Sequence, residues 1–198
     1  SMPALVEGGR PDFLLVAVGT EANVPVLYQA MGFGLPLLAE TPLSWNERDG
    51  SALVRQARGR GIALGMLEQF PFTPAEQLKR KLIALGAIGA VTAAVNDFAS
   101  YDYHGLAQLR AYAGYGLQAE SVSARRVQFG PTEQWLLGTI RMTGGVLLLH
   151  NYSAGYAMLP TRPPGELRVL GQSGSLVGEQ AIFVDRTKTT RTSAPFIR

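Results

Sequence analysis

The sequence predicts a chain in two parts: an α/β part with a parallel βαβαβ unit, then an α+β part with a mainly antiparallel, open-faced sheet and flanking helices. Up to residue 67, short apolar runs alternate with helical segments, which is the order of a parallel βαβαβ unit. Beyond residue 114 the segments are extended and separated by turns rich in Gly and Pro, which indicates antiparallel strands. Charged residues make up only 17% of the 198, so we expect a folded, well-buried chain.

The elements of the first part follow from apolar runs bounded by turn residues. Six consecutive apolar residues, 13–18, suit a strand that is buried on both faces of a parallel sheet. Ser44 followed by Glu47 is a capping-box pattern, so we expect Ser44 to begin a helix. The predicted order is strand 13–18, helix 24–31, strand 35–39, helix 44–59 and strand 62–67.

The second part, residues 73–198, is predicted to start with a helix, and the first part comprises residues 1–72. Thr73 and Glu76 form another capping-box pattern, with Pro74 at the first helical position. The expected apolar face of this helix is Leu78, Leu82 and Leu85, opposite Lys79, Arg80 and Lys81. The later elements are predicted as strands 91–98, 121–129, 135–142, 146–151, 167–170 and 176–184, and a helix 106–113.

Composition excludes several classes of protein. The net charge is +3, from 18 basic and 15 acidic residues, which is too small an excess to indicate a nucleic-acid partner. The chain has no Cys, which excludes disulfides and thiolate chemistry, and its two His residues lack carboxylates at ligand spacing, which predicts no metal site. No apolar run reaches about 18 residues and no signal peptide is visible, so we expect a cytoplasmic protein with no membrane partner.

Two stretches carry the candidate chemistry. Glu40, Thr41 and Pro42 come after a predicted strand and before a helix, which is where ligands collect in an open α/β sheet. The alternative is that Glu40 bonds a neighbouring loop and Thr41 is a turn residue. An imidazole can take up and release a proton near neutral pH, so the side chain of His104 suits proton transfer. The alternative is a satisfied, semi-buried histidine between two tyrosines.

Other aromatic residues have structural interpretations. His150 ends a predicted strand, and we expect a structural role for it. Trp135, Tyr152 and Tyr156 are expected to fill the sheet core or an oligomer face rather than to bind substrate.

Four stretches, in order, resemble the Gfo/Idh/MocA family of nicotinamide-dependent oxidoreductases. They are residues 16–23, the Glu-x-Pro-Leu motif at 40–43, residues 67–74, and residues 101–106 with His104. The departures from the family pattern are Gly19 for Pro, Thr41 for Lys, Pro71 for Arg, and Ser100 and Ala107 for two Asp residues.

The resemblance implies hydride transfer between NAD or NADP and a sugar- or cyclitol-like hydroxyl compound. It implies a partial Rossmann-like cofactor domain in residues 1–72 and a substrate and oligomerisation domain in residues 73–198. His104 would handle the proton, Asp102 would stand in for a missing carboxylate, and Thr41 would donate an uncharged hydrogen bond. The cofactor-side residues implied are Gly19, Asn23, Glu40, Thr41, Pro42 and Gln69. The partners implied are a small-molecule substrate and further copies of this chain, bound through the C-terminal sheet.

For two of these residues a second interpretation stays open. Asn23 and Gln69 are polar amides at predicted loops, and as exposed loop amides they need no function.

The Gly-x-Gly-x-x-Gly motif of a dinucleotide site is absent from the sequence. In the family this motif lies upstream of the segment that matches residues 11–18, so we expect this chain alone to bind no NAD(P) with useful affinity. Two interpretations follow: a truncated enzyme, or a reduced relative that has lost cofactor binding. The rival function is a non-catalytic, cofactor-free binding or assembly protein, favoured by Thr41 and opposed by His104.

Overall fold

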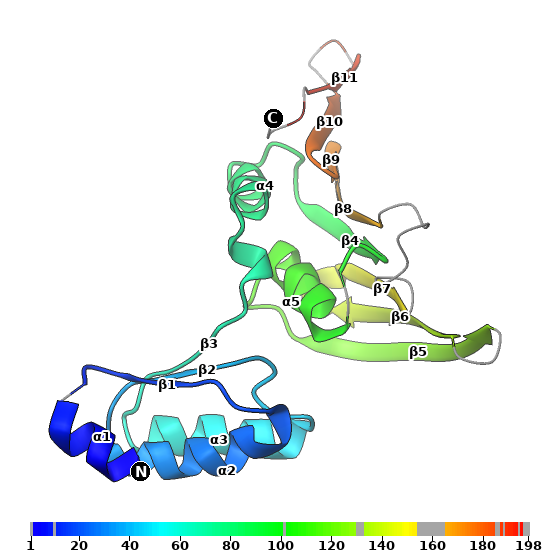
Figure 1. Ribbon diagram of the computed structural model, residues 1–198. Coiled ribbons are helices and arrows are strands. Elements are labelled where there is room, and N and C mark those ends of the chain that lie inside the picture. The colour runs from blue at the N-terminus through cyan, green and yellow to red at the C-terminus, as the bar shows by residue number, and fades with distance from the viewer. Residues whose placement is uncertain are drawn as a thin grey trace. The chain divides into compact units, whose positions relative to one another are not determined.

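The computed structural model describes residues 2–9, 11–100, 102–129, 133–153, 165–184, 187, 189–193 and 195. The chain divides into two compact units, Ser1–Glu68 and Gln69–Arg198, each with its own sheet (Figure 1). None of the helices in these residues combines the length and the apolar character that crossing a bilayer requires.

The first unit is built on a three-stranded parallel sheet. Its strands lie in the order β1 (Leu14–Val16), β2 (Leu37–Ala39) and β3 (Leu64–Met66), and they are connected by α2 (Thr20–Ala30), η1 (Met31–Phe33) and α3 (Glu47–Gly59). The helix α1 (Met2–Gly9) precedes them. The predicted parallel βαβαβ order is confirmed.

Within the described residues, helices cover one face of this sheet. Leu27 and Leu53, from α2 and α3, pack in one cluster with Val16 and Leu37 of the strands, and all four are buried. On the opposite face, Leu15 is 54% exposed. The prediction of a strand buried on both faces is therefore wrong for β1, because apolar content alone does not reveal how many faces are covered.

Asn46 caps the helix α3, and the expected cap at Ser44 is wrong. The Oδ1 atom of Asn46 accepts the N–H of Asp49 at 2.9 Å, and α3 begins at Glu47. The hydroxyl of Ser44 donates instead to the backbone oxygen of Asn46. Ser and Asn are comparable cap formers, so the sequence pattern alone did not separate two candidates that lie two residues apart.

The second unit contains an eight-stranded sheet of order β11-β10-β9-β8-β4-β7-β6-β5. Its strands are β4 (Val91–Asp97), β5 (Ala119–Phe129), β6 (Glu133–Met142), β7 (Leu147–Ser153), β8 (Glu166–Gly171), β9 (Gly174–Val177), β10 (Gln180–Val184) and β11 (Thr190–Thr192). The helical elements are η2 (Phe70–Phe72), α4 (Pro74–Ala84), α5 (Asp102–Ala113) and η3 (Thr143–Gly145). The β4–β7 pair is parallel and the other pairs are antiparallel, which confirms a mainly antiparallel sheet.

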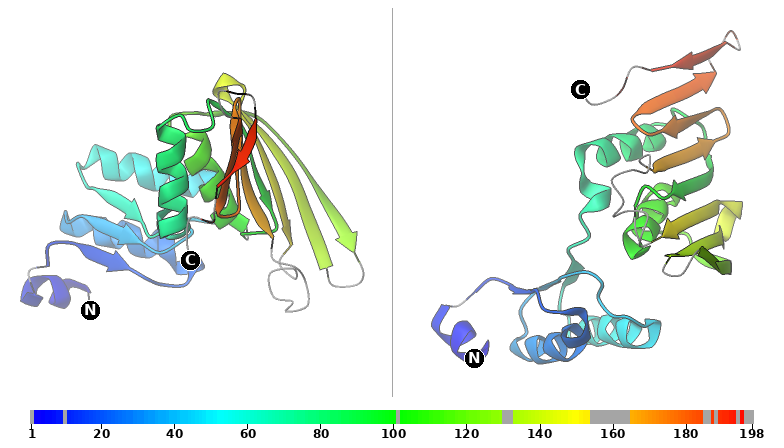
Figure 2. Two further views of the ribbon diagram at one scale, coloured as in Figure 1. Left: turned by 90° about the horizontal axis from the view of Figure 1, so that it is seen from above. Right: turned by 45° about the vertical axis from the view of Figure 1, so that its right-hand side comes forward.

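The helices α4 and α5 lie on one face of this sheet (Figure 2). Leu109 and Tyr112 of α5 pack with Leu148 of β7 and Val169 of β8 in one buried cluster, and Leu82 of α4 packs against it. Among the described helices of this unit, neither α4 nor α5 packs against the opposite face, so the sheet is open-faced within the unit, as predicted.

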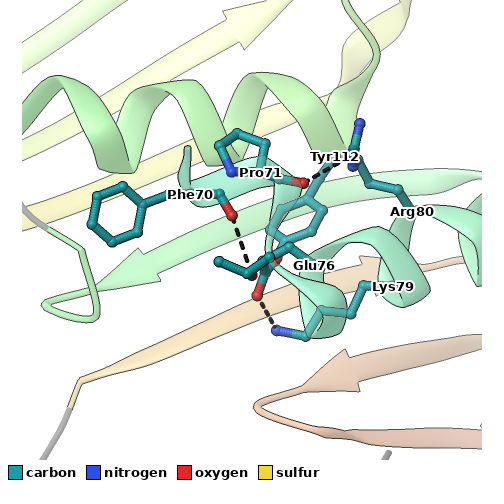
Figure 3. Close-up of polar contacts among 7 residues, drawn as sticks. Phe70, Pro71, Glu76, Lys79, Arg80 and Tyr112 are labelled. Carbon is teal, nitrogen blue, oxygen red and sulfur yellow. Dashed lines mark hydrogen bonds and ion pairs between the residues drawn. The ribbon is translucent and has the colours of Figure 1, made fainter. Parts of the chain in front are cut away.

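The polar residues of α4 differ from the prediction. Lys79 is only 3% exposed, whereas Leu85 is 72% exposed. Glu76 does not close a capping box: it accepts from the Nζ of Lys79 at 2.7 Å and from the hydroxyl of Tyr112, and all three side chains are buried (Figure 3). The predicted polar face is thus partly buried, because Tyr112 on α5 supplies a partner from 36 residues away.

Candidate functional site

In the first unit, the carboxyl ends of the three strands lie at one edge. Just beyond the paired residues of the strands, the N–H of Glu40 donates to the carbonyl of Val16 at 2.9 Å. In the same way, the N–H of Leu67 donates to the carbonyl of Ala39 at 2.9 Å. Gly19 follows β1 at the same edge and is the N-cap of α2. The edge therefore brings Gly19 and the Glu40–Pro42 loop to the side where open α/β sheets bind ligands.

Asn23 ties α2 to this loop. Its side chain is buried, and Nδ2 lies 3.1 Å from the carbonyls of Glu40 and Pro42 and 3.4 Å from that of Leu43. Its Oδ1 atom is buried and has no hydrogen-bond partner within the described residues. Asn23 is therefore not an exposed loop amide: its nitrogen holds the loop in place, and its oxygen keeps one unfilled acceptor position.

The loop itself presents small polar groups. Glu40 is exposed, and the hydroxyl of Thr41 donates to its Oε1 at 3.5 Å. The Thr41–Pro42 peptide is cis. A threonine hydroxyl at this position donates or accepts a hydrogen bond but carries no charge, so it stabilises a developing alkoxide less than a lysine would.

In the second unit, the candidate residues gather at the start of α5. His104 is buried in the first turn, with its ring centroid 4.7 Å from that of Phe70 and 4.2 Å from that of Tyr103. Gln69 is exposed and is the N-cap of η2, the turn that carries Phe70. The structure thus brings the turn after Gln69 against the imidazole of His104.

The turn η2 is fastened to α4. The guanidinium of Arg80 donates to the carbonyl of Pro71 at 2.7 Å, and the Thr73 hydroxyl donates to the carbonyl of Phe70 at 3.3 Å (Figure 3). The contact of Glu76 with Tyr112 then joins α4 to α5. These contacts position Phe70, and through it they constrain the ring of His104.

The buried amide of Asn96, at the end of β4, organises the loop before α5. Its Oδ1 accepts the N–H groups of Ala99 and Ser100 at 3.1 and 3.0 Å, and its Nδ2 donates to the carbonyl of Ser100 at 2.6 Å. Two backbone donors on one atom identify that atom as the oxygen. The loop that presents Asp102 is therefore held by one side chain.

The orientation of this amide fixes the proton on His150. Nδ1 of His150 lies 3.0 Å from Nδ2 of Asn96. Because Nδ2 is a donor, Nδ1 accepts, and the neutral ring carries its proton on Nε2. Burial lowers the pKa of His150 below its usual value of 6.5, and the nearby charge of Asp102 opposes this shift.

His150 is 3% exposed, and its Nε2 has no hydrogen-bond partner within the described residues. The sequence indicated only that it ends a strand, and this is wrong, because β7 continues to Ser153. Its link to Asn96 joins residues 54 positions apart on parallel neighbours, β4 and β7, and this pairing has no short-range signal.

Gly105 allows α5 to approach this pair closely. A Cβ atom at Gly105 would lie 2.5 Å from Nδ2 of Asn96 and 2.6 Å from Cε1 of His150. A side chain at this position would displace α5 from the sheet.

A cavity of about 250 Å³ lies beside the start of α5. Its lining residues are Asp102, Arg126, Gln134, Trp135, Leu136 and Tyr152. Trp135 and Tyr152, which were expected to fill the sheet core or an oligomer face, are half-buried and line this cavity. Tyr156, which had the same expectation, lies outside the described residues.

No cluster of three His, Asp or Glu side chains able to hold a metal ion occurs in the part of the chain that the structure describes. His104, Asp102 and His150 come from the second unit, and Gly19, Asn23 and the Glu40–Pro42 loop come from the first.

The fold is similar to that of solved NAD-binding oxidoreductases of the Gfo/Idh/MocA type. An oxidoreductase from Agrobacterium radiobacter, in complex with NAD+, L-tartaric acid and magnesium, matches all of this chain with a TM-score of 0.80 at 18% identity. An inositol dehydrogenase homolog complexed with NAD+, from Azotobacter vinelandii, matches 96% of this chain with a TM-score of 0.74 at 17% identity. Biliverdin reductase from Synechocystis, in complex with biliverdin and NADP+, matches all of it with a TM-score of 0.73 at 17% identity.

At these identities the likeness concerns the fold. The chain spans 66% of the Agrobacterium protein and 60% of the Azotobacter protein, less than two thirds of either. No protein-family model matches the sequence, and no curated protein does.

Proposed function

We propose that this chain is part of an NAD(P)-dependent oxidoreductase that transfers hydride between the nicotinamide and a hydroxyl-bearing carbon of a sugar- or cyclitol-like compound. The observation that carries the proposal is the shared fold, in which solved neighbours bind NAD+ or NADP+. The position of His104 in the first turn of α5 adds to it. Residues 1–72 would serve the cofactor, and residues 73–198 the substrate.

Six residues of the proposal belong to the cofactor side. A bound nicotinamide would supply the hydride acceptor. The edge formed by Gly19 and the Glu40–Pro42 loop suits its ribose and carboxamide, because exposed polar groups gather there and Asn23 keeps a buried, unfilled oxygen acceptor. Gln69 adds an exposed amide of its own.

His104 is the proposed proton acceptor in alcohol oxidation. As the substrate C–H bond breaks with its electron pair, the hydroxyl proton must leave, and an imidazole takes it near neutral pH. Asp102, two residues earlier, is proposed to stabilise the imidazolium. Thr41 would donate a hydrogen bond to the substrate oxygen.

The test uses the complete gene product with NAD+ or NADP+ and a panel of sugars and cyclitols. We expect reduced nicotinamide to form, and His104→Ala to lower kcat by about 10²–10⁴-fold, the usual contribution of general acid–base catalysis. The matched control is Tyr115→Phe, an exposed ring beyond α5, which should leave kcat unchanged. Equal turnover in wild type and His104→Ala would refute the assignment.

The present chain alone is proposed to bind NAD(P) too weakly to be useful. The sequence has no Gly-x-Gly-x-x-Gly loop to bring backbone N–H groups to a pyrophosphate. Calorimetric titration of this chain with NAD+ should give no micromolar binding. A micromolar Kd would contradict this part of the proposal.

We also propose that the open face of the eight-stranded sheet joins copies of the chain. Leu147, Ala93 and Leu170 are cross-strand neighbours on β7, β4 and β8, and Leu147 and Leu170 are 38% and 40% exposed. Exposed apolar side chains that lie side by side on a sheet offer a surface on which a second copy of the chain can pack. Light scattering should detect an oligomer that Leu147→Lys dissociates, whereas a monomeric wild type would exclude this interface.

The second candidate function is a non-catalytic binding or assembly protein. The observation that favours it is the uncharged Thr41 in the loop after β2, together with Ser100 and Ala107 at the carboxylate positions of the family pattern. Absence of turnover in the complete gene product, with an intact oligomer, would support it.

A further inference from the structure

The cavity beside α5 has the character of a site for a small polar ligand. Its volume of about 250 Å³ is below the range of about 300–1,000 Å³ usual for drug-sized ligands. Five of its six lining residues bear charged or hydrogen-bonding side chains: Asp102, Arg126, Gln134, Trp135 and Tyr152. A cavity with this lining favours a compact ligand rich in polar groups.

Arg126 supplies the positive charge of the cavity. It lies opposite Leu136, which in turn lies opposite Tyr152, so the three form a row across β5, β6 and β7 on one face of the sheet. Arg126 makes no ion pair and no side-chain hydrogen bond among the residues that the structure describes. A guanidinium presents parallel N–H groups that match the two oxygens of a carboxylate.

Asp102, the first residue of α5, supplies hydrogen-bond acceptors to the cavity. An ionised carboxylate only accepts hydrogen bonds, so it selects hydroxyl groups and disfavours a second anion beside it. Its backbone φ is 43°, a rare conformation for a non-glycine residue, in a loop that the Asn96 amide fastens. The position of Asp102 is thus held against its own backbone preference.

The ring of Tyr152 supplies an apolar wall. It lies parallel to the ring of His150, with ring centroids 6.1 Å apart and planes 8° apart. Arg126, Asp102 and Tyr152 together suit a ligand with one carboxylate, several hydroxyls and an apolar C–H face.

We propose that this cavity binds a polyhydroxy carboxylate, that is, a sugar acid, with Arg126 holding the acid group and Asp102 accepting from hydroxyl groups. The inference rests on the proposed function for its link to catalysis, and it narrows the substrate from sugar-like compounds to sugar acids. It predicts that neutral polyols bind more weakly than sugar acids, because they offer no negative charge to the guanidinium of Arg126.

The test compares D-gluconate with D-sorbitol, which have the same six carbons but differ in the acid group. The chain has two tryptophans, so in a Trp45→Phe background the indole N–H of Trp135 is a single NMR reporter at the cavity. At constant ionic strength, gluconate should bind at least about tenfold more tightly than sorbitol, the effect expected of a charge-assisted bidentate contact. Arg126→Gln should bring the two Kd values together.

Arg125→Gln is the matched control. Arg125 is the next residue of β5 and pairs with Leu137, so it belongs to the opposite face of the sheet. This variant should keep the preference for gluconate. Equal binding of both probes by the parent protein, no binding of either, or equal losses in Arg125→Gln and Arg126→Gln would each overturn the proposal. The titration measures ligand binding to the cavity and needs no cofactor. A failure of this proposal can therefore be told apart from a failure of the proposed function, which the NAD(P)-dependent turnover assay tests.

Discussion

The two sheets of this protein place their polar candidate residues differently. In the first unit, Gly19 and Glu40 stand exposed at the carboxyl edge of a parallel sheet, and the order of the elements alone leads to that edge. In the second unit, Asn96, His104 and His150 are buried between α5 and the sheet. Backbone topology and one buried amide, that of Asn23, build the first site, whereas pairs of buried side chains build the second.

This difference has a consequence for stability. An exposed polar residue costs little when it is changed, but a buried polar residue leaves its partner unsatisfied when it is removed. We therefore expect the second unit to be the more sensitive of the two to polar substitutions.

The largest expected effect is at the buried ion pair of α4. Lys79→Met should lower the free energy of unfolding of the second unit by about 3–5 kcal/mol, because Glu76 loses its cation while buried. The measurement is urea unfolding followed by Trp135 fluorescence in the Trp45→Phe background. Lys81→Met, at an exposed position of the same helix, should change stability by less than about 0.5 kcal/mol. Similar losses in both variants would show that the pair does not stabilise the fold.

The next effect is at the contact of α5 with the sheet. Gly105→Ala should destabilise the second unit by about 1–3 kcal/mol, because the added methyl overlaps Asn96 and His150. Gly59→Ala, at the last residue of α3 with no atom within 4 Å of the added Cβ, should be neutral or stabilising by up to about 1 kcal/mol. Thermal unfolding followed by circular dichroism compares the Tm of both variants with that of the wild type. A Tm that is unchanged or raised in Gly105→Ala would contradict the prediction.

The pH dependence of the second unit should report His150. Burial lowers the pKa of His150 in the folded state. Above pH 6.5 the histidine is neutral in both the folded and the unfolded state, so its contribution to the free energy of unfolding is fully present there. As the pH falls below 6.5 the unfolded histidine takes up a proton first, and stability is lost at up to about 1.4 kcal/mol per pH unit. Urea unfolding of wild type and His150→Gln between pH 5 and 8 should give the shallower slope in the variant; parallel curves would exclude this contribution.

At alkaline pH the corresponding group is Tyr112. Burial and the neighbouring Glu76 raise its pKa well above 10, so its contribution is present below pH 10. Above pH 10 the unfolded tyrosine ionises first, and stability falls. Tyr112→Phe should remove this alkaline loss, and a wild-type slope that persists in the variant would contradict the account.

The smallest effect concerns the first unit and its helix cap. Asn46→Ala should destabilise the first unit by about 1 kcal/mol, because the N–H of Asp49 loses its acceptor. Ser44→Ala should cost less, since its hydroxyl bonds only a carbonyl. Unfolding followed by Trp45 fluorescence measures both variants. A larger loss of stability in Ser44→Ala than in Asn46→Ala would contradict the assignment of Asn46 as the cap and would support Ser44 instead.

The fold of the first unit could be predicted from the sequence because it depends on patterns of residues that are close together in the chain. Apolar runs, turns and the right-handed connection of parallel strands lead to one sheet order and one functional edge. Three details failed. The cap of α3 is Asn46 and not Ser44, and Leu15 is exposed although its strand is apolar throughout. The helix α2 begins at Thr20 and not at Val24, so Asn23 lies in the helix and not in a loop.

The second unit was predicted less completely because its site depends on contacts between residues far apart in the chain. The strands were recognisable, but the parallel pairing of β4 with β7, which brings Asn96 to His150, was not. Lys79 looked like part of a solvated face because its burial depends on the Glu76–Tyr112 contact. Arg126 carried no motif at all, and only the register of β5, β6 and β7 brings it to the cavity.

The most direct measurement of the central claim is the fate of the hydride. The complete gene product would be incubated with NADH carrying deuterium at the transferable C4 position and with the keto form of a sugar acid. The account predicts one deuterium, found by mass spectrometry on the carbon that becomes the alcohol, and its loss in His104→Ala. A product without deuterium, or no product in the wild-type protein, would contradict the assignment of hydride transfer.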